Sequence, residues 1–108
     1  MKHKMSLYGI YGEHTIADCP LNKKENRQIV YKAQEGLGKL AESMGAKLVA
    51  QYHSGLEHTF LWVFESPDAK RLEELMIKSG TVSFNSCRIV PLLDFDQLAA
   101  RLRELDNA

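Results

Sequence analysis

Apolar residues follow two patterns along the chain, and each pattern predicts one kind of element. Spacings of three and four residues predict helices over 23–44, 67–79 and from Asp94 onward. Runs rich in β-branched and aromatic residues predict strands over 6–11, 46–53, 57–65 and 81–92. The predicted class is therefore α+β, with the order β-α-β-β-α-β and a C-terminal helix. That order is typical of the ferredoxin-like split βαβ fold, an antiparallel sheet with strand order 4-1-3-2 and both helices on one face.

Polar residues at the predicted helix starts indicate caps. Asn22 with Glu25 three residues later predicts a capping box for the long helix. Asp94 with Gln97 repeats the pattern for the last helix. The second helix is predicted to begin at Pro67, because proline favours the first helical position.

The third predicted strand is apolar on both faces. Alternation places one set of side chains on each face: His58, Phe60, Trp62 and Phe64 on one, and Thr59, Leu61 and Val63 on the other. The helices of one chain cover only one face, and a second copy of the sheet is the simplest cover for the other. We therefore predict a homodimer with sheet facing sheet. The alternative is that the C-terminal helix folds beneath the sheet and covers it.

Composition narrows the class of protein. The 108 residues predict a single domain over 5–108, with residues 1–4 as a disordered leader or tag remnant. Lys+Arg and Asp+Glu both number 14, and this balance disfavours nucleic acid and membrane surfaces as partners.

No apolar stretch approaches the about 18 residues of a membrane span. Cys19 and Cys87 form no paired motif, so we expect reduced thiols and a cytoplasmic location.

Four side chains with metal-binding or acid–base chemistry are predicted to meet at one end of the sheet. They are His14 after the first strand, Cys19 in the following loop, His53 at the end of the second strand and His58 near the start of the third. The first interpretation is a transition-metal site formed by His14, Cys19 and His58. Imidazole and thiolate suit Zn, Ni, Cu or Fe, and Glu13, His53 or Glu57 are candidates for a fourth ligand.

The second interpretation is a small-molecule pocket. His14 or His58 would act as the catalytic acid or base, since histidine titrates near neutrality. The ligand-binding candidates are Tyr11, Phe60, Trp62 and Asn85, which would supply apolar walls and polar contacts. The third interpretation is structural: the histidines are half-exposed hydrogen-bonding residues, the aromatic stripe is core, and Cys19 is a small buried residue.

Short motifs carry a resemblance to a known family. They are His14-Thr15, Cys19-Pro20-Leu21-Asn22, Glu25 and Arg27, then Glu57-His58 and Ser83-Phe84-Asn85. With the element order, they resemble the dimeric α+β barrel superfamily, in a branch of small uncharacterised proteins that share the His…Cys-Pro-Leu-Asn opening. Wider relatives include muconolactone isomerases, cofactor-free monooxygenases, haem-dependent chlorite-dismutase-like enzymes and a nickel-responsive protein.

The resemblance implies a ligand cavity without fixing a reaction. We expect a small dimeric ligand-binding protein with a His/Cys-lined site for a transition metal (Zn, Ni or Fe) or a small molecule. One alternative is a cofactor-free isomerase or monooxygenase-like enzyme on a small aromatic or lactone-like substrate. The other is a structural or regulatory dimer without a ligand.

Overall fold

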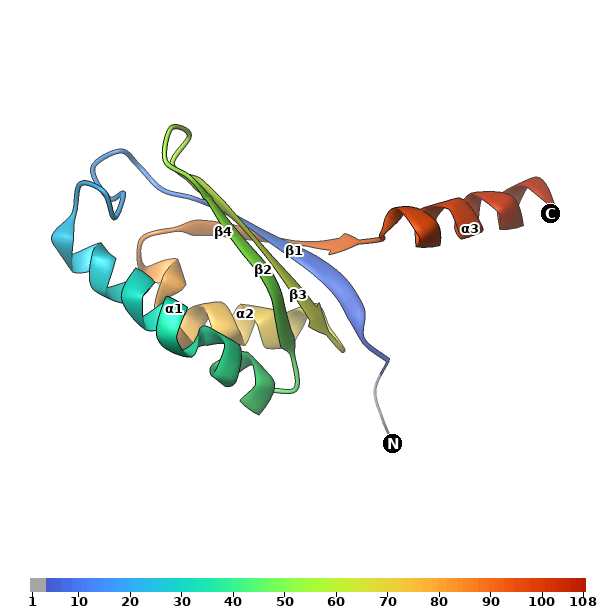
Figure 1. Ribbon diagram of the computed structural model, residues 1–108, viewed down its shortest axis with the longest axis horizontal. Helices are drawn as coiled ribbons and strands as arrows, with labels where there is room; N and C mark the ends of the chain where they lie inside the picture. The colour runs from blue at the N-terminus through green and yellow to red at the C-terminus, as the bar shows by residue number, and fades with distance from the viewer. Residues whose placement is uncertain (1–3) are drawn as a thin grey trace.

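The computed structural model describes residues 4–108, in four strands and three α-helices (Figure 1). A single 3-10 turn, Thr81–Ser83, adjoins the second helix. The elements in chain order are β1 (Ser6–Glu13), α1 (Lys24–Ser43), β2 (Lys47–Ser54), β3 (Thr59–Ser66), α2 (Ala69–Lys78), β4 (Ser86–Leu92) and α3 (Phe95–Asp106). Of the predicted leader, residues 1–3 lie outside the described residues.

The four strands form one antiparallel sheet in the order β2-β3-β1-β4. Helices α1 and α2 lie on the same face of this sheet (Figure 1). The α+β class, the antiparallel sheet and the presence of three helices are therefore confirmed.

The core lies between the sheet and these two helices. Its buried side chains come from β1, β3, α1 and α2 and include Ile10, Phe60, Phe64, Leu37, Leu72, Leu75 and Met76. Gly12 is required in β1 because a Cβ at this position would overlap the ring of Phe60. The face of β3 that carries Phe60, Trp62 and Phe64 is therefore the one that meets the helices.

The opposite face of the sheet is left open. Gly9 on this face borders Leu61 and Leu92, and register adds Val63 and Val90. All four of these larger side chains are only partly buried. The open face therefore presents an apolar patch around Gly9.

Helix α3 does not cover the open face. It extends away from the sheet beyond the end of β4 (Figure 1), and none of its twelve residues is buried. The radius of gyration is 15.8 Å, against about 13 Å for a compact chain of this length. The alternative in which the C-terminal helix folds beneath the sheet is therefore wrong.

The helix starts differ from the predictions in two cases. The cap of α1 is Lys23, without a side-chain hydrogen bond. Asn22 does not form the predicted box, because its Nδ2 donates to the carbonyl of Ile16 at 2.8 Å. Helix α2 begins after the cap Asp68, whose side chain accepts from Arg71 N–H, rather than at position 67. The capping box of α3, Asp94 with Gln97, is confirmed.

The fourth strand begins later than predicted. Residues 81–83 form the 3-10 turn, and β4 starts only at Ser86. The β-branched residues Thr81 and Val82 suggested a strand, but Gly80, with φ of 77°, turns the chain out of α2 and into the 3-10 turn. As a result, Phe84 and Asn85 lie in a connection beside the end of β1 rather than in the sheet.

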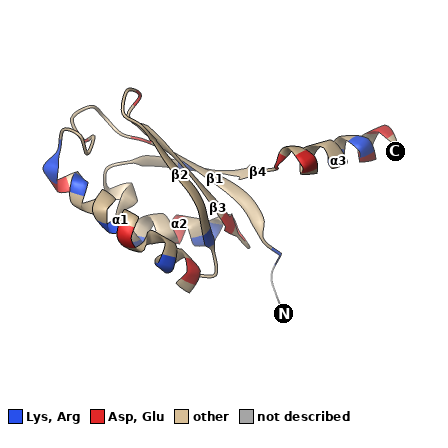
Figure 2. Ribbon diagram, viewed as in Figure 1, with Lys and Arg blue, Asp and Glu red and all other residues tan. Residues whose placement is uncertain are grey.

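Charged residues of both signs are interspersed along all three helices, as Figure 2 shows in blue and red. Within residues 4–108, no helix is both long and apolar enough to cross a membrane.

Candidate metal centre

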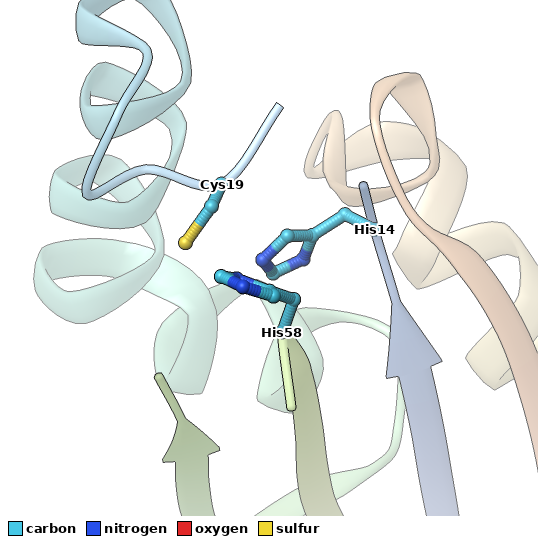
Figure 3. A group of neighbouring side chains, drawn as sticks. All are labelled: His14, Cys19 and His58. Carbon is cyan, nitrogen blue, oxygen red and sulfur yellow. The ribbon is translucent and has the colours of Figure 1, made fainter. Parts of the chain in front are cut away.

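Three donor side chains meet at one end of the sheet. His14 directly follows β1, Cys19 lies in the loop between β1 and α1, and His58 directly precedes β3. One ligand atom from each residue lies within 4.8 Å of the other two. Figure 3 shows the three side chains pointing toward one another. The predicted grouping of His14, Cys19 and His58 is thus present in the structure.

Backbone hydrogen bonds hold Cys19 in a turn on both sides. Its N–H donates to the carbonyl of Thr15 at 3.0 Å, and its carbonyl accepts from Asn22 N–H at 2.8 Å and Lys23 N–H at 2.9 Å. The Cys19 side chain is fully buried. The thiol is therefore fixed in position by the loop that carries it.

Polar side chains of α1 fasten this loop to the body of the protein. Asn26 Nδ2 donates to the carbonyl of Asp18 at 2.7 Å, and Arg27 Nε donates to the carbonyl of Pro20 at 2.8 Å. Asn26 is itself buried. These bonds flank Cys19, so the first turns of α1 set where the thiol lies.

His14 is oriented by a buried amide. Its Nδ1 lies 2.8 Å from Asn85 Oδ1, and Asn85 Nδ2 donates to the carbonyl of Thr81 at 2.9 Å. Because the amide nitrogen is used by Thr81, the oxygen faces His14 and Nδ1 carries the proton that it accepts. His14 Nε2 is then left with a free lone pair, the arrangement found in metal-ligating histidines.

Two ring nitrogens of the cluster have no partner. Among residues 4–108, His14 Nε2 and His58 Nδ1 are the buried side-chain nitrogen or oxygen atoms that lack a hydrogen bond. Such an atom costs about 1–3 kcal/mol when left unsatisfied. Both atoms belong to the two histidines that each have a ring nitrogen within 4.8 Å of Cys19 Sγ.

The backbone of His58 is also unusual. Its φ is 57°, in the left-handed region that residues other than glycine rarely adopt. Its carbonyl accepts from His14 N–H at 3.0 Å, which joins the two histidine backbones. His58 therefore lies in the turn before β3 and not within the strand, where it was predicted.

His53 lies beside the cluster without joining it. Its ring stacks on His14 with centroids 5.8 Å apart, but it is not among the residues whose ligand atoms converge. Partial burial lowers the pKa of His53 from 6.5, and positive charge on His14 or His58 would lower it further. The other two candidates for a fourth ligand, Glu13 and Glu57, do not belong to the converging set either.

An apolar cavity of about 350 Å³ adjoins the cluster between α1 and the sheet. His14 and Asn85 form part of its wall, together with Phe60 and Trp62, whose rings lie 4.4 Å apart between centroids. Three of the four predicted ligand-binding residues therefore line the same cavity. Tyr11 is separated from them, since it lies on the open face of the sheet with the guanidinium of Arg88 5.7 Å from its ring centroid.

Sequence reasoning missed the contacts that the connection before β4 makes with His14. Asn85 was predicted to supply a polar contact to a ligand, whereas its Oδ1 bonds to His14 Nδ1, a contact between residues 71 positions apart. The Phe84 ring lies 5.7 Å from the His14 ring. Spacing in the sequence carries no signal for either contact, because the predicted strand ran through both positions.

Comparison with known proteins gives a family without an activity. No curated protein and no solved structure matches the chain. Residues 16–106, which include Cys19 and His58, match the family described as "Domain of unknown function (DUF3303)". Because this match spans most of the sequence, the chain belongs to the DUF3303 family.

Proposed function

We propose that this protein binds a transition-metal ion through His14 Nε2, Cys19 Sγ and His58 Nδ1. The observation that carries the proposal is the pair of buried ring nitrogens without partners, on two histidines that each have a ligand atom within 4.8 Å of a fully buried thiol. A metal ion would satisfy both nitrogens at once. It would also account for the left-handed backbone at His58, because strained conformations persist where a site requires them.

The donor set narrows the choice of metal. Two imidazoles and one thiolate suit zinc, nickel or iron, whereas magnesium and calcium prefer oxygen ligands. Asn85 would act as a positioning residue, since a hydrogen bond to the second ring nitrogen holds a ligating histidine in one tautomer.

Cobalt(II) titration of the full chain tests the proposal, because cobalt substitutes for zinc and a thiolate ligand gives an intense charge-transfer absorption. We expect one ion per chain and this absorption in the parent protein. The Cys19→Ser variant should lose the absorption, and the matched variant Cys87→Ser should keep it. Cys87 is half-buried on β4 and lies outside the converging set. A parent protein that binds no cobalt, or an absorption that survives Cys19→Ser, would overturn the proposal.

The apolar cavity favours a second candidate, a cofactor-free isomerase or monooxygenase-like enzyme on a small aromatic or lactone-like substrate. His14 lines that cavity and would serve as acid or base there, with His58 as the alternative. This candidate requires no metal. A parent protein that binds neither cobalt nor zinc would therefore favour it over the metal site.

We also propose that the chain adopts the ferredoxin-like arrangement of a dimeric α+β barrel, with a second copy against the open face. Two features support the dimer: the partly buried apolar side chains of that face, and the exposed apolar residues of α3, among them Phe95, which is 85% exposed. Apolar surfaces of this kind are typical of protein interfaces. A purely structural dimer would leave the two unpartnered nitrogens without a role.

A further inference from the structure

The three converging donors leave a bound ion incompletely coordinated. Structural zinc sites are usually closed by four protein ligands, whereas sites that act on other molecules use three and keep one position open. In the described part of the chain, the converging set contains three residues. A divalent ion with one thiolate and two neutral imidazoles carries a net charge of +1 (2 − 1), which favours an anionic fourth ligand.

The adjoining cavity offers room for the rest of such a ligand. Its volume of about 350 Å³ lies at the small end of the range for small-molecule sites, about 300–1,000 Å³. Ile29 and Ala33 of α1 face Phe60 and Trp62 of β3 across it. His14 forms part of its wall, so the cavity reaches one of the proposed metal ligands directly.

The residues that line the cavity limit the charge that the body of the ligand can carry. Within residues 4–108, no Lys, Arg, Asp or Glu lines this cavity. Its polar groups are amides and hydroxyls, among them Gln34 and Gln51, and the imidazoles of His14 and His53. A second charge on the ligand would be buried without a permanently charged residue to balance it, at a large cost in desolvation.

Resting on the proposed metal site, we propose that the cavity takes a small organic monoanion whose charged head completes the metal coordination. Its body is flat and apolar and packs against Phe60 and Trp62. An uncharged polar group at the far end could bond to Gln34 or Gln51. The ligand class is therefore a small aromatic molecule with one metal-binding anionic head.

Two hydroxamates test this inference on the cobalt-loaded full chain. Acetohydroxamate carries the metal-binding head alone, and benzohydroxamate adds an aromatic body. If the body enters the cavity, benzohydroxamate binds about 30-fold more tightly, the gain expected from burying a phenyl ring. Binding is read from the cobalt ligand-field bands, while the thiolate-to-cobalt absorption reports that the ion stays in place.

A pair of variants tests whether the preference for benzohydroxamate over acetohydroxamate depends on the cavity. Val30 lines it from α1, so Val30→Trp should reduce benzohydroxamate affinity at least about 10-fold with unchanged cobalt loading. Tyr31 is half-exposed and does not line it, so the matched Tyr31→Trp should have no effect.

The possible failures are distinguishable. Equal affinities for the two hydroxamates, no spectral change, or extraction of the ion would overturn this inference and leave the metal site standing. An absence of cobalt binding before any hydroxamate is added would overturn the proposed function itself.

Discussion

The two faces of the sheet have similar side chains in different surroundings. On the covered face, Phe60 and Phe64 pack beneath α1 and α2 and are 6% and 0% exposed. On the open face, Leu61 and Val63 come from the same strand and remain partly exposed. The covered face continues into the cavity and the His/Cys cluster, whereas the open face ends beside the extended helix α3.

The difference separates two roles of apolar surface. On the covered face, burial within one chain stabilises the fold and shapes a cavity beside the proposed metal ligands. On the open face, the same residue types remain available for a second copy. We therefore expect substitutions on the covered face to act mainly on the free energy of unfolding. Substitutions on the open face should act mainly on the dissociation constant of the proposed dimer.

Truncation on the covered face should have the largest effect on the fold. Phe64→Ala removes a fully buried ring and should lower the free energy of unfolding by about 3–5 kcal/mol, because it leaves a cavity in the core. Leu61→Ala on the open face should cost less than half as much under conditions where the chain is monomeric. Urea denaturation of the parent and both variants measures the two losses in the free energy of unfolding. Equal losses would show that the open face is as fully packed as the core.

A charge on the open face should separate the copies without unfolding them. Val63→Asp should weaken the proposed dimer about 100-fold or more, because it places an unpaired carboxylate in the interface. Sedimentation equilibrium gives the dissociation constant. The control is Lys39→Asp on the exposed side of α1, which should leave association unchanged. A parent chain that stays monomeric at high concentration would contradict the dimer and the pairing of the open faces.

The elements were predictable from sequence because their apolar spacing reflects burial in one chain. The α+β class, the antiparallel sheet and the Asp94–Gln97 box followed from such local patterns. The convergence of His14 and His58 followed from topology, since strand ends meet at one edge. The first-helix cap failed because Asn22 bonds to the loop instead. Such competition for a side chain, here from a carbonyl six residues earlier in the loop, leaves no trace in the helical spacing.

The contact between Asn85 and His14 could not be predicted from residue spacing either. Substitutions at Asn85 test whether this contact supports metal binding. Asn85→Leu removes the acceptor for His14 Nδ1 and should weaken metal binding about 10–100-fold. Asn85→Asp keeps an acceptor and should retain most of the affinity. Competition with a chromophoric chelator measures both variants. If the two variants bind equally weakly, the amide holds the local fold and does not orient His14.

Replacing His58 by glycine should have opposite effects on stability and on metal binding. His58→Gly relieves the left-handed backbone and should raise the free energy of unfolding of the metal-free protein by about 1 kcal/mol, while abolishing metal binding. Glu57→Gly is the control, since Glu57 has no positive φ and should gain no stability. Thermal unfolding in chelator gives the comparison. A loss of stability in His58→Gly would mean that the imidazole packing outweighs the backbone strain.

The smallest expected effect concerns pH and His53. Its pKa in the folded protein lies below 6.5, first through burial and then through charge on His14 and His58. Below pH 6.5 the unfolded chain therefore takes up a proton that the folded chain resists, and stability falls as pH decreases toward the folded pKa. Above 6.5 both states hold neutral imidazole, so this contribution to stability is fully present. The effect is modest because the ring is largely exposed.

Urea denaturation of the metal-free protein at pH 7.5 and pH 5.5 measures this slope. His53→Gln cannot take up the proton, so its stability should decrease less between the two pH values than that of the parent. Arg88→Gln, on the open face of the sheet, is the control and should keep the parent's slope. If His53→Gln and the parent lose the same stability, the pH response comes from elsewhere in the chain. His53 would then be an ordinary exposed residue at the boundary between the two faces.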